Sequence, residues 1–219
     1  MGHERIDQFI DELNINIGHN YMRIEEIFNT EYNYPELDPL RDEICKCLIC
    51  GLYQAAITLT NHLLESSLKK CLAIKYEIDN KNPQLELKDA FKDGISHYNS
   101  WNLNKTINEA RIKQLITEEQ KNQLHQFRED FRNAYSHADA AKTFLDCHPK
   151  IKFISSSDVV TYEDFLKIIA EKPNTEISIK DFLPIQGIAQ AIFAQKEAVP
   201  YFIEIDNIIR NMLLKLKQY

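Results

Sequence analysis

The 219-residue chain has few of the residues that make tight turns. It contains only 5 glycines and 7 prolines, too few for the many turns of a β-sandwich or β-barrel. Leu, Ile, Lys, Glu and Gln are abundant instead, and a composition of this kind favours helices. The composition therefore predicts an all-α fold.

The sequence also lacks long apolar runs. No stretch of about 18 apolar residues is present, which argues against a membrane-spanning helix. The first residues form no apolar signal region. Five cysteines are an odd number, and Cys45, Cys47 and Cys50 lie within six positions, which is a poor disulfide framework. These features predict a reduced, cytoplasmic protein without a membrane partner.

Several motifs of catalytic or metal sites are missing. The chain has no Gly-rich phosphate loop, no serine nucleophile elbow and no His-Glu-x-x-His zinc motif. Cys47-x-x-Cys50 has zinc-like spacing, but it lies in an apolar helical run and needs Cys71 or Cys147 as further ligands. We therefore expect structural thiols, and neither a metal nor another cofactor.

Basic charge is not in excess. The formal net charge is −7, from 33 acidic and 26 basic side chains. A protein that coats nucleic acid without sequence preference carries a basic face over much of its surface. The charge excludes that class but is compatible with a small basic site on an acidic protein.

Apolar residues recur every three or four positions over most of the chain, as in amphipathic helices. Thr117-Glu118-Glu119-Gln120 matches a capping box, with Thr117 as N-cap. The pattern predicts a helical bundle core in residues 1–139 and a C-terminal helical extension, residues 140–219, packed on the same domain. The expected helices cover residues 3–29, 40–77, 88–97, 105–116, 117–131, 158–170 and 183–217, the last kinked or split at Pro200, with a short strand or extended segment near 151–154.

The best candidate for a functional site is Arg132-Asn133-Ala134-Tyr135-Ser136-His137. Arginine binds phosphate oxygens with a planar fork of donors that stays charged. Histidine exchanges protons near neutral pH. The two side chains together are suited to chemistry on a phosphodiester.

This segment resembles the motif of the HEPN superfamily, the higher eukaryotes and prokaryotes nucleotide-binding domains. The motif of that family is an Arg, usually followed by a polar residue, with a His four to six positions beyond it. The resemblance covers residues 40–138, including Gly51 and the alanines that follow it. It implies an up-and-down helical bundle and a metal-independent endoribonuclease of a prokaryotic toxin or phage-defence system.

The resemblance also implies roles for individual residues. His137 would transfer protons, Arg132 would stabilise the phosphorane, and Asn133 would orient one or both of them. Glu65 and Lys69 lie one turn apart on a predicted helix, and a Glu and a Lys at this spacing support the Arg and His in some HEPN ribonucleases. A surface ion pair of about 0.3 kcal/mol is the alternative interpretation of Glu65 and Lys69.

The spacing of the motif raises a geometric question. On an ideal α-helix, Arg132 and His137 are separated by about 140°. Either the helix ends near Ser136, or Arg132 reaches around it, or two chains share the site. The resemblance favours the last arrangement, a homodimer with a composite active site.

Two further functions fit the same residues. The chain can be a non-catalytic HEPN-like module that binds a nucleotide, RNA or a protein partner, or a scaffold protein in which Arg132 and His137 are surface residues. For the ribonuclease we expect RNA as substrate and an antitoxin or other regulatory protein as partner.

Overall fold

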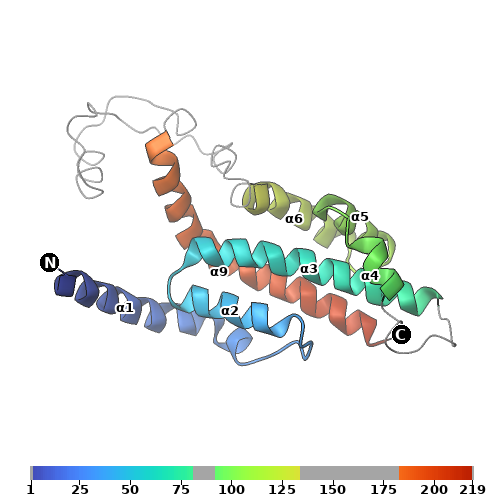
Figure 1. Ribbon diagram of the computed structural model, residues 1–219, viewed down its shortest axis with the longest axis horizontal. Coiled ribbons are helices and arrows are strands. Elements are labelled where there is room, and N and C mark those ends of the chain that lie inside the picture. The colour runs from blue at the N-terminus through green and yellow to red at the C-terminus, as the bar shows by residue number, and fades with distance from the viewer. Residues whose placement is uncertain (1, 81–91, 134–182, 219) are drawn as a thin grey trace.

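The computed structural model describes residues 2–80, 92–133 and 183–218. Within these ranges the chain forms helices and no strand, which confirms the all-α helical bundle (Figure 1). The elements are α1 (Gly2–Phe28), α2 (Asp38–Ile49), α3 (Tyr53–Asn80), α4 (Lys92–Tyr98), α5 (Leu103–Ile112), α6 (Glu118–Phe127), the π-helical segment η1 (Arg128–Asn133) and α9 (Leu183–Leu216).

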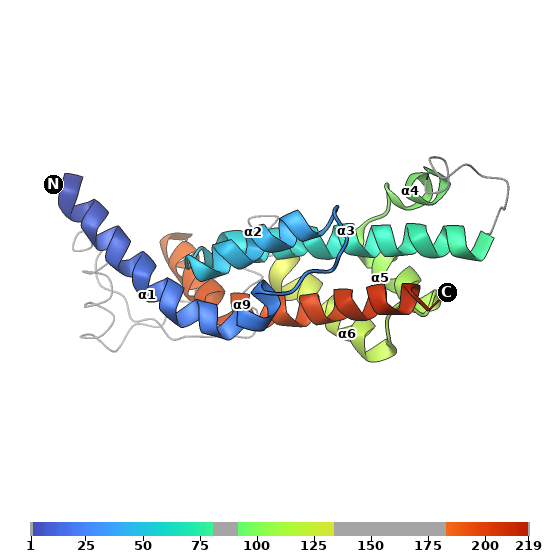
Figure 2. The same ribbon diagram turned by 90° about the horizontal axis from the view of Figure 1, so that it is seen from below.

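Helix α3 is the centre of the bundle. Helix α9 packs along it, α1 and α2 lie on one side of this pair, and α4, α5 and α6 lie on the other (Figures 1 and 2). The core is formed largely by apolar side chains of α3 and α9, because these two helices bury an apolar stripe along their shared length. The fully buried members include Ile57, Leu63, Leu68 and Leu72 of α3 and Phe202, Ile205, Ile209 and Met212 of α9.

The single helix predicted for residues 40–77 is wrong, because the chain turns between α2 and α3. Gly51 has φ 77°, a left-handed conformation that glycine adopts without steric cost. The amide of Gly51 donates to Leu48 O at 3.0 Å and that of Leu52 donates to Cys47 O at 2.8 Å. These two bonds are a Schellman motif, which ends α2 and reverses the chain into α3.

Helix α9 continues through Pro200 as one helix of 34 residues. Of the two predicted outcomes, a kink or a split, the split therefore does not occur, and the ribbon of α9 is bent along its length (Figure 1). Its side chains belong to the main core rather than to a separate layer. The boundary predicted at residue 139 and the elements predicted at 151–154 and 158–170 lie outside the described residues.

Helix α1 extends beyond the other helices at its N-terminal end (Figure 2). Apolar residues recur at the same spacing along the whole of α1. Ile24 near its C-terminal end is 1% exposed, whereas Ile6 and Ile10 near its N-terminal end are 57% and 47% exposed. Only the C-terminal half of α1 therefore contributes to the core. In the described ranges no helix is both long enough and apolar enough to cross a membrane.

Candidate functional site

Helix α6 leads directly into the Arg132 segment. Its predicted capping box is confirmed: Thr117 Oγ1 accepts from the Gln120 amide at 3.1 Å, and Gln120 Oε1 accepts from the Thr117 amide at 2.9 Å. From Arg128 the α-helix changes to the π-helix η1, where the hydrogen bonds run from i to i+5. Because π-helical turns are rare and often lie at functional sites, this change marks the segment structurally.

Aromatic packing fixes η1 on the bundle. The Phe131 ring stacks on Tyr201 of α9, with centroids 4.0 Å apart and planes 8° apart. Phe127 contacts the same tyrosine edge-on at 5.1 Å. The Tyr201 hydroxyl donates to Asn61 Oδ1 of α3 at 2.7 Å, and burial raises the pKa of this tyrosine. The backbone that carries Arg132 is thus held by both long helices.

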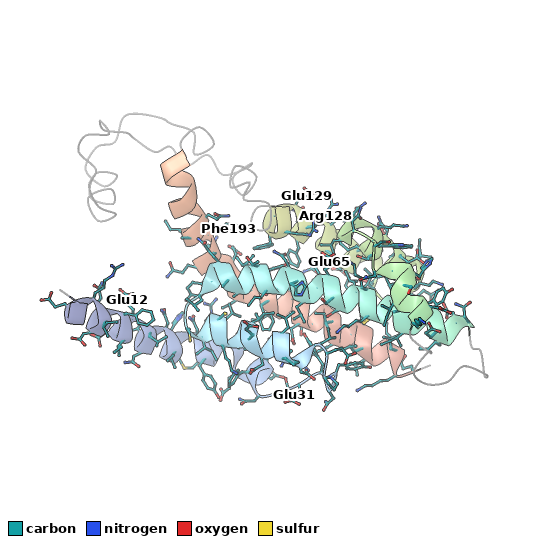
Figure 3. All side chains as sticks on the ribbon, in the orientation of Figure 1. Glu12, Glu31, Glu65, Arg128, Glu129 and Phe193 are labelled. Carbon is teal, nitrogen blue, oxygen red and sulfur yellow. The ribbon has the colours of Figure 1, made fainter. Side chains whose placement is uncertain are left out.

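Arg132, Glu65 and Lys69 lie together in space. Arg132 Nη2 is 3.5 Å from Glu65 Oε2, although the two residues are 67 positions apart. Lys69 Nζ donates to Glu65 Oε1 at 3.0 Å and to the backbone oxygen of Asn99 at 3.0 Å. In Figure 3 the labelled Glu65 lies on α3 on the side facing η1.

The geometry of this cluster leaves Arg132 available for a ligand. The side chain of Arg132 is 26% exposed and that of Glu65 is 27% exposed, so solvent reaches both. A separation of 3.5 Å is long for a charge-assisted hydrogen bond, which is usually 2.7–2.9 Å. Glu65 therefore orients the guanidinium without engaging all of its donors.

Arg128 is a second guanidinium on η1 that the sequence analysis did not single out. It lies four positions before Arg132 and pairs with Glu129. Its Nε is buried and has no hydrogen-bond partner among the described residues. A spacing pattern in the sequence indicates Arg128. Basic or titratable side chains follow one another at steps of four, three and four residues, which places them on one helix face: Lys121, His125, Arg128 and Arg132.

The pKa of His125 reflects its burial and the nearby charges of Arg128 and Lys121. The pKa of His125 is lowered by burial and then by the charges of Arg128 and Lys121. Its ring nitrogen Nε2 is 3.1 Å from Asn108 Oδ1 of α5. His125 thus lies close to the two cations Arg128 and Lys121, and the nearby Glu129 partly offsets their effect.

The structure does not describe the side chains of the other two predicted site residues of the motif, Asn133 and His137. Asn133 ends η1, and its side chain is not among those described. His137 lies outside the described residues. One other histidine is on the face of the cluster: His62 is exposed on α3, three positions before Glu65 and seven before Lys69, spacings that share a helix face.

A second charged cluster connects the α1–α2 loop to α9. Asp206 is completely buried and accepts from Arg41 Nε at 2.7 Å, Tyr32 Oη at 2.7 Å and Arg210 Nε at 2.6 Å. Both guanidiniums also lie over the Tyr32 ring, at 4.9 and 5.2 Å, and donate to oxygens of residues 27–31. Because these groups satisfy one another, the cluster is structural, although a cleft of about 440 Å³ adjoins Arg210.

The cysteines are free thiols where the structure describes them. Cys45 and Cys71 are buried, whereas Cys47 and Cys50 are partly exposed. Burial raises the pKa of Cys45 and of Cys71 to about 12 in each case. In the described ranges no three His, Cys, Asp or Glu side chains are grouped as metal ligands.

Comparison of the chain with protein-family models, with curated proteins and with solved structures finds no match.

Proposed function

We propose that the protein is a metal-independent endoribonuclease of the HEPN type, belonging to a prokaryotic toxin or phage-defence system. The observation that supports this most is the contact between Arg132 and Glu65, with Lys69 on the same carboxylate. The resemblance of the motif implies the same grouping of an Arg with a Glu and a Lys. In a scaffold protein the same contacts would be ordinary surface ion pairs, and the activities of the Arg132 and His137 variants distinguish the two.

The reaction requires three events at one phosphodiester. The 2′-hydroxyl loses a proton and its oxygen bonds to phosphorus. The bond from phosphorus to the 5′-oxygen breaks, and that oxygen takes up a proton. Arg132 neutralises the charge on the phosphorane oxygens through two parallel hydrogen bonds, and His137 carries the protons.

The relation of Arg132 to His137 is not explained by one regular α-helix, since residues five apart point about 140° away from each other. The described π-helix η1 ends at Asn133, and His137 lies outside the described residues. A homodimer with two motifs in one cleft remains part of the proposal, since it concentrates positive charge on an acidic protein.

The test is cleavage of single-stranded RNA in excess chelator. The wild-type protein is expected to leave 2′,3′-cyclic phosphate ends without added metal. Arg132→Ala and His137→Ala are each expected to lose activity at least a hundredfold, which is the usual lower range for removing one group that stabilises transition-state charge or one acid–base group. His19→Ala, an exposed histidine of α1, is the matched control and should remain fully active.

Three outcomes contradict the proposal. Cleavage that requires magnesium excludes the mechanism. Activity that survives in His137→Ala but disappears in His62→Ala moves the acid–base role to α3. RNA binding without turnover identifies the non-catalytic module instead.

A further inference from the structure

An aromatic cluster lies at the turn between α4 and α5, and it contacts α3 at Tyr76, about 16 Å along the helix from Glu65. The His97 ring stacks on Tyr76 of α3, with centroids 5.4 Å apart and planes at 21°. Trp101 contacts both His97, at 5.3 Å, and Tyr98, at 4.9 Å. Tyr98 is buried and supports the cluster from below, whereas His97 is exposed and Trp101 is partly exposed.

This cluster is connected to the proposed catalytic site by a continuous series of contacts. Lys69 Nζ, which binds Glu65, also binds the backbone oxygen of Asn99. Asn99 is two residues before Trp101 in the same turn. Arg132, Glu65, Lys69 and the aromatic turn thus form one surface that crosses α3 from η1 to α4.

Cations are spread along this surface. Lys105 Nζ lies 3.5 Å from the centroid of the Trp101 ring, so a third cation joins Arg132 and Lys69. Glu65 lies between Arg132 and Lys69. Burial raises the pKa of Tyr98, and the carboxylates of Glu109 and Asp79 are close enough to raise it further, so acidic groups alternate with these cations.

We propose that single-stranded RNA lies along this surface, with the scissile phosphate at Arg132 and a base further along the strand stacked on the Trp101–His97 cluster. The proposal depends on the ribonuclease function. Proteins that bind single strands combine cations for the backbone with aromatic rings for the bases, and this surface has both. Duplex RNA does not fit, since its bases are already stacked.

Lys105 has a specific part in this arrangement. In the free protein its ammonium group covers the Trp101 ring through a cation–π contact. A base that stacks on the ring displaces the ammonium, which then pairs with the adjacent phosphate. Lys105 thus exchanges the Trp101 ring for an RNA phosphate. Until RNA binds, its ammonium group covers the face of the ring.

Trp101 makes the proposal directly measurable because it is the only tryptophan of the chain. Wild-type protein is titrated with a 2′-O-methyl oligonucleotide, which lacks the attacking hydroxyl and cannot be cleaved. We expect saturable quenching of tryptophan emission, with the same midpoint as the anisotropy of the labelled oligonucleotide. A duplex of the same sequence should give no quenching.

Two variants separate the roles of base and phosphate. His97→Ala is expected to weaken binding about tenfold, within the range for loss of one stacked base, without changing the salt dependence. Lys105→Gln should weaken binding and lower the slope of log K against log salt by about 0.7, which corresponds to one phosphate contact on a single strand. Lys196→Gln, an exposed lysine of α9, is the control and should match the wild type.

The outcomes distinguish this proposal from the proposed function. Cleavage of RNA with no change in Trp101 emission, or with a normal KM in both variants, overturns the stacking surface and leaves the ribonuclease intact. Quenching without cleavage supports the surface and overturns the ribonuclease. Equal loss of binding in Lys196→Gln and Lys105→Gln indicates general charge attraction and contradicts the specific site.

Discussion

At the scale of single residues, Asp206 connects α9 to α2 and to the loop between α1 and α2. Its carboxylate has no exposed surface and binds Arg41 from α2, Arg210 from its own helix and the Tyr32 hydroxyl. A buried charge that loses its partner costs far more free energy than an exposed one. The loop between α1 and α2 therefore depends on a residue more than 160 positions further along the chain.

Asp206→Asn is expected to lower the free energy of unfolding by about 3–5 kcal/mol, because Arg41 then remains buried without a counter-charge. Equilibrium unfolding in urea measures this change. The control is Asp42→Asn, which removes an exposed i,i+4 pair with Lys46 and should cost less than about 1 kcal/mol. Equal effects in the two variants would contradict the structural role of Asp206.

Asp79 makes the stability of the fold depend on pH. Hydrogen bonds from Lys75 first, and also from Lys113 of the α5 end, lower its pKa below the ordinary value of 3.8. A carboxylate whose pKa is lower in the folded state stabilises the fold above its unfolded pKa, and this stabilisation is lost as the pH falls through the folded pKa. Thermal unfolding between pH 6 and pH 2 should therefore show a steeper acid decline for wild type than for Asp79→Asn, and parallel curves would refute the assignment.

At the scale of elements, α1 shows how far a sequence pattern predicts burial. Its apolar residues continue at spacings of three and four from Ile6 to Ile27, and the helix was predicted within a residue or two of its observed ends. The pattern does not reveal that only the second half has a neighbouring helix. Burial depends on where α2 and α9 end, and no local periodicity encodes that.

The two halves of α1 should respond differently to the same substitution. Ile24→Ala removes a side chain from the core and is expected to cost about 2–5 kcal/mol. Ile10→Ala alters a residue that is 47% exposed and should change the free energy of unfolding by less than about 0.5 kcal/mol. A large effect of Ile10→Ala in urea unfolding would indicate that the outer half of α1 is covered in solution.

The break between α2 and α3 is the main error of the helix prediction, and its physical cause is one residue. Gly51 interrupts a pattern that is apolar on both sides, so periodicity alone favours one long helix. A Cβ at this position would lie 2.5 Å from Asn16 Nδ2 of α1. The turn is therefore selected by its left-handed backbone and by the close approach of α1.

At the scale of the whole molecule, the reactivity of the cysteines shows whether the bundle unfolds as one cooperative unit. Cys45 and Cys71 are almost completely buried, and a thiol with a pKa of about 12 is almost entirely protonated near neutral pH. Their modification requires opening of the bundle, whereas Cys47 and Cys50 are partly exposed in the folded protein.

Thiol labelling tests this difference in a Cys147→Ser variant, which leaves the four described cysteines. Two thiols should react before unfolding, and Cys45 and Cys71 should react only at the rate of global opening. Mass spectrometry of labelled peptides identifies the sites. Early labelling of Cys71 would show that α3 opens locally, which contradicts a single cooperative core.

The proposed site was only partly predictable from the sequence. The Arg132 motif, its position after a capped helix and the Glu65–Lys69 pair are local patterns, and all could be named from the chain. The contact between Arg132 and Glu65 was implied by the resemblance, but no local pattern shows it. The π-helical turn at Arg128 and the Trp101–His97 cluster could not be named, because they depend on how elements distant in the sequence pack together.

The sequence by itself determined the all-α class, the position of α1 and the capping box at Thr117, because helix propensity, apolar period and capping act over three or four residues. Only the tertiary structure decided which helix faces meet, which half of α1 is buried, and that Arg132 lies against a carboxylate 67 positions earlier. Such contacts arise when all helices bury their apolar stripes together. The packing of the whole bundle therefore sets the relative positions of side chains that no single segment specifies.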